Sequence, residues 1–248
     1  VMNSNHNSTL LLYQAPTGTG KTISPVGLVN DNVVIFTCAA KHVGLQLAKA
    51  CISLEIPIAT AFGCETAEQI RLHYFAATDF TRHRRSGNIF KVDNSQGQKV
   101  KLIITDIKSY LPAMNYMLAF NDEKDIIWYW DEPTITLDYD KHDFHGILEQ
   151  NWKQNCISRI VMSSATLPNE RELLSMIQYY KHKFKGNHHY INSYDCKKAI
   201  SLISSKGNVI IPHLQYENYH DFKQSILFLK DNKTILRYVD ITKVSEFI

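Results

Sequence analysis

The stretch "LLLYQAPTGTGKTISP", residues 10–25, decides how this chain folds. Apolar residues typical of a buried strand lead into a glycine-rich turn, and a helical pattern follows. Residues 15–22 fit the phosphate-loop (Walker A) pattern GxxxxGK[ST], with alanine in place of the first glycine. The backbone N–H groups of such a loop, together with the amino end of the next helix, form a site for phosphate.

This loop predicts an ATP site with a place for Mg²⁺. Gly18 and Gly20 permit its tight backbone path. Lys21 is expected to reach the β- and γ-phosphates, and the Thr22 hydroxyl to ligate the metal. The predicted nucleotide-binding residues are Ala15, Pro16, Thr17, Gly18, Thr19, Gly20, Lys21 and Thr22. The alternative is a glycine-rich turn with no ligand. Pro25 predicts a distorted first helical turn, because proline lacks a backbone donor.

A second candidate site ends the apolar run "DIIWYWDEPT", residues 125–134. Acidic side chains at the carboxyl end of a parallel strand can project into a ligand crevice. We expect Asp131 to hold Mg²⁺ and Glu132 to polarise the attacking water, which makes both catalytic candidates beside Lys21. Taken alone, such an acidic pair is more typical of a solvated loop, and the preceding phosphate loop reverses that interpretation.

A third element is "VMSSATLP", residues 161–168, where a predicted strand ends in small hydroxyl residues. Ser164 and Thr166, which flank Ala165, are short donors suited to hydrogen-bonding an acidic strand end. The plainer interpretation is a strand-to-helix turn with a capping residue.

The hydrophobic pattern predicts an α/β fold with a mostly parallel sheet, because short apolar runs alternate with amphipathic segments. The predicted strands are 9–13, 32–37, 56–62, 100–105, 125–130, 158–164 and 188–192. Two helices are predicted from apolar residues that recur about once per turn: Val43, Leu47, Cys51 and Leu54 in one, and Leu173, Ile177 and Tyr180 in the other. The polar, turn-rich segment 78–99 predicts a surface loop or hairpin.

Composition narrows the class of protein further. The 248 residues are 44% hydrophobic and 21% charged, which is typical of a folded globular protein. The five cysteines form no CxxC pair, and no apolar run approaches the roughly 20 residues of a membrane span. We therefore expect a soluble intracellular protein, cytoplasmic or nuclear, with no membrane partner. Because the chain begins with Val1, we expect it to be a fragment of a longer protein.

In order along the chain, "APTGTGKT", "DEPT" and "SAT" resemble motifs I, II and III of the superfamily 2 helicases, which include the DEAD-box and DEAH-like ATPases. The resemblance covers residues 1–195 and implies a RecA-like three-layer domain with helices on both faces of the sheet. It leaves 196–248 as an extension or linker. It also implies ATP and Mg²⁺ as cofactors and ATP hydrolysis coupled to movement on, or unwinding of, DNA or RNA. "DEPT" matches neither DEAD nor DEAH and so assigns no subfamily. The composition is similar to that of helicase-like proteins of large DNA viruses.

Two further segments extend this resemblance toward nucleic acid. "TCAAKHVGLQLA" looks like motif Ia and "IITDIKSYL" looks like motif Ib, whose loops touch the nucleic-acid backbone in the family. This would place Lys41, His42, Thr105 and Lys108 near a bound strand. Asp106 lies in the same loop, where a carboxylate is a poor contact for phosphate. The net charge of +3 permits such a partner without requiring one.

The family also requires a second RecA-like domain whose QxxGRxxR-type motif supplies arginine fingers. After residue 170 the chain contains only Arg171 and Arg237, and neither lies in that pattern. An arginine finger is worth about 10³ to 10⁵ in rate in related systems. The resemblance therefore implies a partner domain outside this chain, weak hydrolysis by this chain alone, and no small-molecule substrate other than nucleotide.

Two other functions stay open: a stand-alone phosphate-loop nucleotide kinase or transferase, and a non-catalytic nucleic-acid-binding module. The run "RHRR", residues 82–85, could contact phosphate, but basic runs in loops are commonly solvated surface. His142 and His145 have a spacing that could hold a metal, but no third ligand is identifiable.

Overall fold

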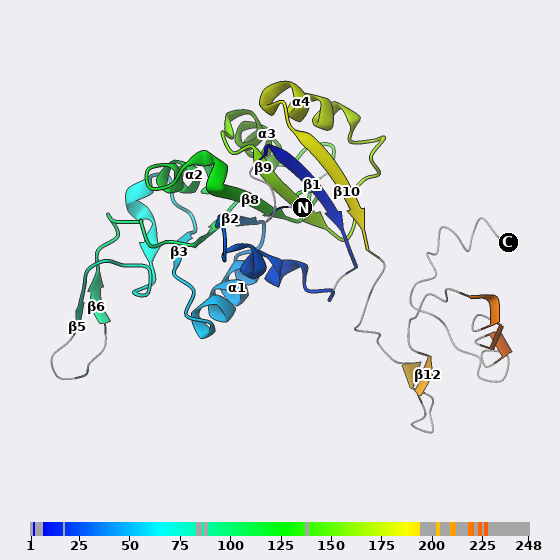
Figure 1. The fold of residues 1–248 in the computed structure, drawn as a ribbon, viewed down its shortest axis with the longest axis horizontal. Helices are drawn as coiled ribbons and strands as arrows, with labels where there is room; N and C mark the ends of the chain where they lie inside the picture. Colours follow the sequence, from blue (N-terminus) through cyan, green and yellow to red (C-terminus); the bar gives the residue numbers. More distant parts are fainter. Residues whose placement is uncertain are drawn as a thin grey trace. The chain divides into compact units, whose positions relative to one another are not determined.

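The computed structural model describes residues 2, 7–16, 18–82, 86, 89–136 and 139–193, together with 202–203, 209–211, 218–220, 223–224 and 226–227. The chain divides into two compact units, Val1–Ser193 and Tyr194–Ile248 (Figure 1). In the second unit, β11 (Leu202–Ile203) and β12 (Val209–Ile211) pair antiparallel. Among the described residues, no helix is both long and apolar enough to span a bilayer.

The first unit is built on an eight-stranded sheet in the order β10-β1-β9-β8-β2-β7-β3-β4. All its pairings are parallel except that of β3 with β4. Its strands are β1 (Thr9–Gln14), β2 (Val33–Cys38), β3 (Ile58–Ala61), β4 (Arg71–Leu72), β7 (Leu102–Asp106), β8 (Ile126–Asp131), β9 (Arg159–Ser164) and β10 (Asn187–Asn192). Parallel strands buried on both faces read as continuous apolar runs, and β2 and β8 are buried along their whole length.

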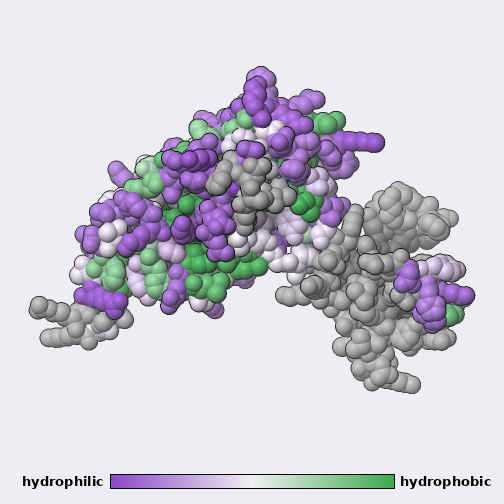
Figure 2. Space-filling view, in the orientation of Figure 1, coloured by the Kyte–Doolittle hydropathy of each residue, from purple (hydrophilic) through white to green (hydrophobic). Residues whose placement is uncertain are grey.

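Helices cover both faces of this sheet, which gives the α/β three-layer, RecA-like architecture predicted from the sequence (Figure 1). One face packs against α2 (Tyr110–Leu118), α3 (Phe144–Gln154) and α4 (Leu174–Phe184). The other packs against α1 (Lys41–Ser53) and the 3₁₀ helix η1 (Lys21–Leu28). Short 3₁₀ turns η2 (Ala67–Gln69) and η3 (Glu123–Asp125) precede β4 and β8. Figure 2 shows mainly hydrophilic residues over α3 and α4, as expected of helices with one solvated face.

Alternation along the strands assigns residues to the two faces. On β1, Leu10 and Leu12 belong to the core beneath α2, α3 and α4, whereas Leu11 packs on the opposite face. The same alternation on β8 puts Trp128 and Trp130 beneath α2, α3 and α4, and Tyr129 beneath η1 and α1. Side chains at the ends of these strands therefore also alternate between the two faces of the sheet.

The predicted strands are confirmed, with ends that differ by one or two residues, and the two predicted helices are confirmed as α1 and α4. The segment 78–99 contains an antiparallel hairpin of β5 (Phe80–Arg82) and β6 (Ile89–Val92), as predicted. Pro25 lies inside η1, so the expected distortion takes the form of a 3₁₀ helix. Helices α2 and α3 were not predicted. Helix α2 is buried on several sides, which weakens its periodicity.

Gly44 sets how closely α1 approaches the sheet. A Cβ added there would lie 2.8 Å from Phe62 Cζ and 2.9 Å from Ile104 Cγ2, whereas one added at Gly146 in α3 would meet nothing within 4 Å. Glycine to alanine within a helix gains about 1 kcal/mol of propensity, and overpacking costs about 1–3 kcal/mol. We expect Gly146→Ala to be neutral or stabilising. In urea unfolding, the Gly44→Ala variant should be less stable than the Gly146→Ala variant by about 2 kcal/mol. Equal stabilities would contradict this close packing.

Candidate nucleotide site

The phosphate loop lies between the carboxyl end of β1 and η1. Gly18 and Gly20 have φ angles of 86° and 89°, in the left-handed region that favours glycine. Thr19 Oγ1 donates to the carbonyl of Pro16 at 2.8 Å and closes the turn. Gly18 and Gly20 thus adopt the backbone conformation for which glycine was expected. Thr17 lies outside the described residues.

Lys21 folds back over the loop that precedes it. Its side chain is buried, and Nζ donates to the carbonyls of Ala15 at 2.7 Å and Pro16 at 3.0 Å. The backbone carbonyl of Lys21 accepts a hydrogen bond from the Tyr129 hydroxyl at 2.8 Å. This bond ties the start of η1 to β8, so Tyr129 supports the loop from the strand that carries the acidic pair.

Asp131 ends β8 on the face covered by η1 and is 5% exposed. Its pKa is raised to about 6, first by burial and then by the charge of Glu132; Lys21 and a hydrogen bond from Thr22 act in the opposite direction. Within the part of the chain that the structure describes, Asp131 Oδ1 is buried without a hydrogen-bond partner. An unpaired buried carboxylate oxygen beside a threonine hydroxyl fits a Mg²⁺ site, because both are oxygen ligands.

Glu132 follows β8 and adopts a φ of 51°, which is uncommon for a residue other than glycine. Its N–H donates to the Ser163 carbonyl at 2.8 Å. The Ser164 hydroxyl donates to Glu132 Oε2 at 2.5 Å, and the Ala165 N–H lies 3.4 Å from Oε1. The Thr166 N–H donates to Ser164 Oγ at 3.1 Å. Residues 164–166, the SAT loop, thus hold the second carboxylate.

Neither a protein-family model nor a curated protein matches this sequence. Among solved structures the chain is similar to a DEAD box protein from the hyperthermophile Methanococcus jannaschii, with 16% identity and a TM-score of 0.49 over 99% of this chain and 66% of that one. It is also similar to a hypothetical ATP-dependent RNA helicase from Sulfolobus tokodaii, with 13% identity and a TM-score of 0.44 over 76% of this chain and 48% of that one. A third similar structure is the Pyrococcus furiosus Hef helicase domain, with 14% identity and a TM-score of 0.42 over 82% of this chain and 39% of that one.

These resemblances concern the overall fold, at identities of 13–16%. The chain spans less than two thirds of the length of each of these structures.

The residues predicted to contact nucleic acid follow β2 and β7, which are neighbouring parallel strands. Lys41 and His42 are exposed at the start of α1, and Lys108 is exposed after β7. Lys41 Nζ lies 5.5 Å from the centre of the Phe62 ring, and Lys108 Nζ lies 5.9 Å from that of Phe144. Both ammonium groups thus lie on the same edge of the sheet as the phosphate loop.

Thr105 differs from its neighbours in this prediction. Its side chain is fully buried and donates to the Asp106 carbonyl at 2.9 Å, so it is not presented at the surface. Asp106 has a structural contact instead: its carboxylate accepts from the N–H groups of Gly63 at 2.7 Å and Ser109 at 2.8 Å. This carboxylate joins the loops after β3 and β7.

The two histidines whose spacing could hold a metal have local hydrogen-bond partners. His145 Nε2 lies 2.9 Å from the Thr136 carbonyl, and His142 Nδ1 accepts from the Phe144 N–H at 3.1 Å. No group of three or more potential metal ligands occurs among the described residues. Of the run 82–85, Arg82 is exposed and the other three residues lie outside the described part of the chain.

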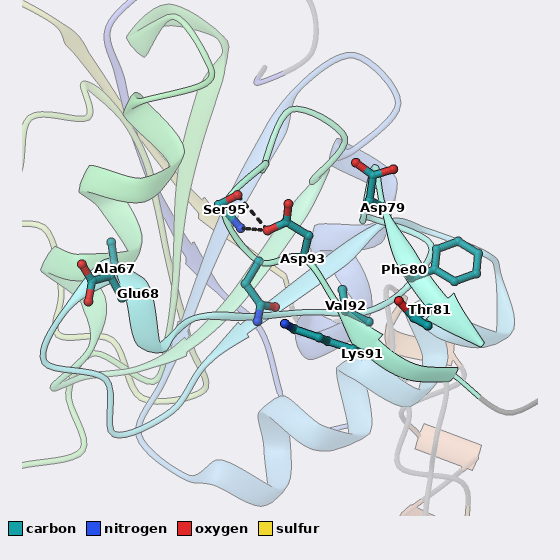
Figure 3. Close-up of a pocket in the computed structure, with 10 residues that line it drawn as sticks. Ala67, Glu68, Asp79, Phe80, Thr81, Lys91, Val92, Asp93 and Ser95 are labelled. Carbon is teal, nitrogen blue, oxygen red and sulfur yellow. Dashed lines mark hydrogen bonds between the residues drawn. The ribbon is translucent and has the colours of Figure 1, made fainter. Parts of the chain in front are cut away.

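An open pocket of about 920 Å³ lies at the base of the β5–β6 hairpin (Figure 3). Carboxylates from Glu68, Asp79 and Asp93 line it together with Lys91, and Asp93 accepts two hydrogen bonds from Ser95 at 2.9 and 2.7 Å. An acidic lining disfavours a triphosphate. This pocket is separate from the phosphate loop, where Lys21 Nζ binds the carbonyls of Ala15 and Pro16.

Burial of Asp131 gives a pH-dependent prediction. The pKa of Asp131 is about 6 in the folded chain, against 3.8 normally. The contribution of its protonated form to the free energy of unfolding is therefore fully present below pH 4 and is lost as the pH rises through 6. Without magnesium, Asp131→Asn should raise the free energy of unfolding at pH 7.5 by up to about 3 kcal/mol, and by almost nothing at pH 4. Thermal unfolding in a chelator measures this change.

The matched control is Asp93→Asn. Hydrogen bonds from Ser95 lower the pKa of this exposed carboxyl, so its loss should leave stability at pH 7.5 unchanged or slightly reduced. A gain at pH 7.5 for both variants would show that the effect is a general response to charge removal. An equal gain for Asp131→Asn at pH 4 would contradict the raised pKa.

Proposed function

We propose that residues 1–193 form an Mg-ATP-binding domain that hydrolyses ATP as part of a helicase-like translocase. The parallel α/β sheet with helices on both faces is the framework of this domain, and we propose that it binds ATP, hydrolyses it and acts on nucleic acid. This proposal concerns the chain together with a second RecA-like domain that would complete the site.

One observation carries the proposal. Three consecutive strands of the sheet, β1, β9 and β8, end at the same edge in parallel, and their loops carry the phosphate loop, the SAT loop and the acidic pair. Ligands of open α/β sheets bind outside the carboxyl ends of the strands. The three motifs that were separate in the sequence therefore adjoin one another at the place where this fold class binds ligands.

The residues divide the chemistry between them. Lys21 would exchange its bonds to Ala15 and Pro16 for phosphate oxygens, which accept stronger charge-assisted hydrogen bonds. Thr22 and Asp131 would hold Mg²⁺, which neutralises charge on the β- and γ-phosphates when bound. Glu132, held by Ser164, would orient and polarise the water that attacks the γ-phosphate, yielding ADP and phosphate.

We propose nucleic acid as the second ligand, along Lys41, His42 and Lys108. These side chains follow β2 and β7. A nucleic-acid strand bound there would therefore run along the same edge of the sheet as the candidate nucleotide site. Each ammonium group offers a phosphate contact without reading sequence. This arrangement favours recognition of the backbone and leaves DNA and RNA as equal candidates.

Lys21→Ala tests the nucleotide site. Removing one charge-assisted contact should weaken Mg-ATP binding at least about tenfold, measured by calorimetry. Lys49→Ala is the matched control, because Lys49 is exposed on α1, away from the loop. Equal affinities for wild type and Lys21→Ala would overturn the site, provided that thermal unfolding shows both proteins folded.

The double variant Lys41→Ala/Lys108→Ala tests the nucleic-acid track. Its affinity for a single-stranded oligonucleotide should fall, and the slope of log affinity against log salt should decrease by about 1.4, or about 0.7 for each lost phosphate contact. Lys49→Ala again serves as the control. An unchanged slope would remove these two lysines from the binding surface. Mg-ATP affinity should stay the same in the double variant and in Lys49→Ala.

A further inference from the structure

The side chain of Gln14 joins three separate segments at the edge of the candidate site. Gln14 Nε2 donates to the Ala165 carbonyl at 3.4 Å, and Gln14 Oε1 accepts from the Tyr190 hydroxyl at 2.5 Å. Its backbone carbonyl accepts from the Ser193 N–H at 2.8 Å. One residue thus contacts the SAT loop, β10 and the last residue of the first unit.

Gln14 is a polar residue that follows two buried leucines on the same face of β1. Leu10 and Leu12 precede it on the same face of β1 and are completely buried in the core beneath α2, α3 and α4. Gln14 is the next side chain on that face and is half-buried at the end of the strand. An amide there, with both its ends bonded, indicates a directed contact and not a simple continuation of the core.

We propose that Gln14 is a positioning residue that sets the SAT loop, and through it Glu132, relative to the phosphate loop. The proposal rests on the function proposed above for the same site and names a residue that its three motifs do not include. Gln14 immediately precedes the loop, and the Ala15 N–H donates to the Ser164 carbonyl at 3.2 Å. The side chain and the next backbone group therefore hold the SAT loop at two adjacent points.

From the SAT loop the contacts continue to the second carboxylate. Ser164 donates to Glu132, and the Ala165 N–H faces the same carboxylate. Ala165 is therefore held from both sides: Gln14 binds its carbonyl, and Glu132 accepts its N–H. Movement of the phosphate loop on nucleotide binding would reach Glu132 through this residue.

The same side chain extends the connection to the end of the unit. Tyr190 and Ser193 lie at the carboxyl end of β10, and the chain continues from Ser193 into residues 194–248. Because Gln14 binds Tyr190 through its side chain and Ser193 through its backbone carbonyl, a shift of β1 at the phosphate loop would also reach the last residue of the first unit. Gln14 thus acts through others and does not touch the reacting atoms.

Hydrogen exchange in the nucleotide-free chain tests the contact itself. Gln14→Leu removes both side-chain bonds with little change in volume, and Gln14→Glu keeps an acceptor for Tyr190 but cannot donate to Ala165. Both variants should speed exchange of the Ala165 and Thr166 amides by about fivefold, the effect of losing one hydrogen bond. Tyr13→Phe, which removes a hydroxyl one residue away on the opposite face, should leave these amides unchanged.

Single-turnover hydrolysis with excess protein tests the positioning role. Gln14→Leu should slow hydrolysis of bound ATP by about tenfold while the affinity for Mg-ATP stays within about twofold of wild type, because misplacement of a catalytic group affects the chemical step. A merely structural role would lower the unfolding temperature without this separation of rate from affinity. Gln14→Asn, which keeps the amide on a shorter side chain, should recover part of the rate.

The outcomes separate the two proposals. Faster exchange together with slower hydrolysis at unchanged affinity supports the role of Gln14. Unchanged exchange, or unchanged hydrolysis in a protein whose wild type is active, overturns that role and leaves the proposed function intact. A wild-type chain that binds no Mg-ATP overturns the proposed function, and the role of Gln14 falls with it.

Discussion

The parallel pairing of β1, β9 and β8 is the constraint on which the site depends. Each strand runs in the same direction, so their carboxyl ends reach one edge and their loops become neighbours. The Ala15 N–H to Ser164 carbonyl bond and the Glu132 N–H to Ser163 carbonyl bond continue the two ladders beyond the strands. The loops are thus aligned by the same backbone hydrogen bonds that form the sheet.

Pleating then divides this edge between two faces. Asp131, Lys21 and Thr22 lie on the side of η1, where burial raises the pKa of Asp131. The SAT loop and Gln14 lie toward the opposite core. Glu132, which follows Asp131 and has a left-handed backbone, accepts a hydrogen bond from Ser164 on this second side. Such strain and such a buried carboxylate both cost stability, and they occur at adjacent residues of one loop. Costs of this kind are typical of functional sites.

Several features of the fold and of the candidate site could be predicted from the sequence because they depend on neighbouring residues. The apolar runs predicted the strands, the glycines predicted the loop, and Pro25 predicted the distortion of η1. Other features depend on distant partners. Thr105 ends a predicted strand and was expected near a bound nucleic-acid strand, yet it is completely buried in β7, which lies between β2 and β3. Gln14 belongs to no motif, and its significance comes from residues 165, 190 and 193.

The sequence by itself determined the elements of this domain and the chemical groups available to it, since both follow from short-range periodicity and side-chain type. The tertiary structure alone decided which groups meet. Strand order places β9 between β1 and β8, and this order sets Ser164 beside Glu132 and Ala165 beside Gln14. Strand order depends on how the sheet buries its two faces against helices from distant parts of the chain. A local pattern carries no record of that packing.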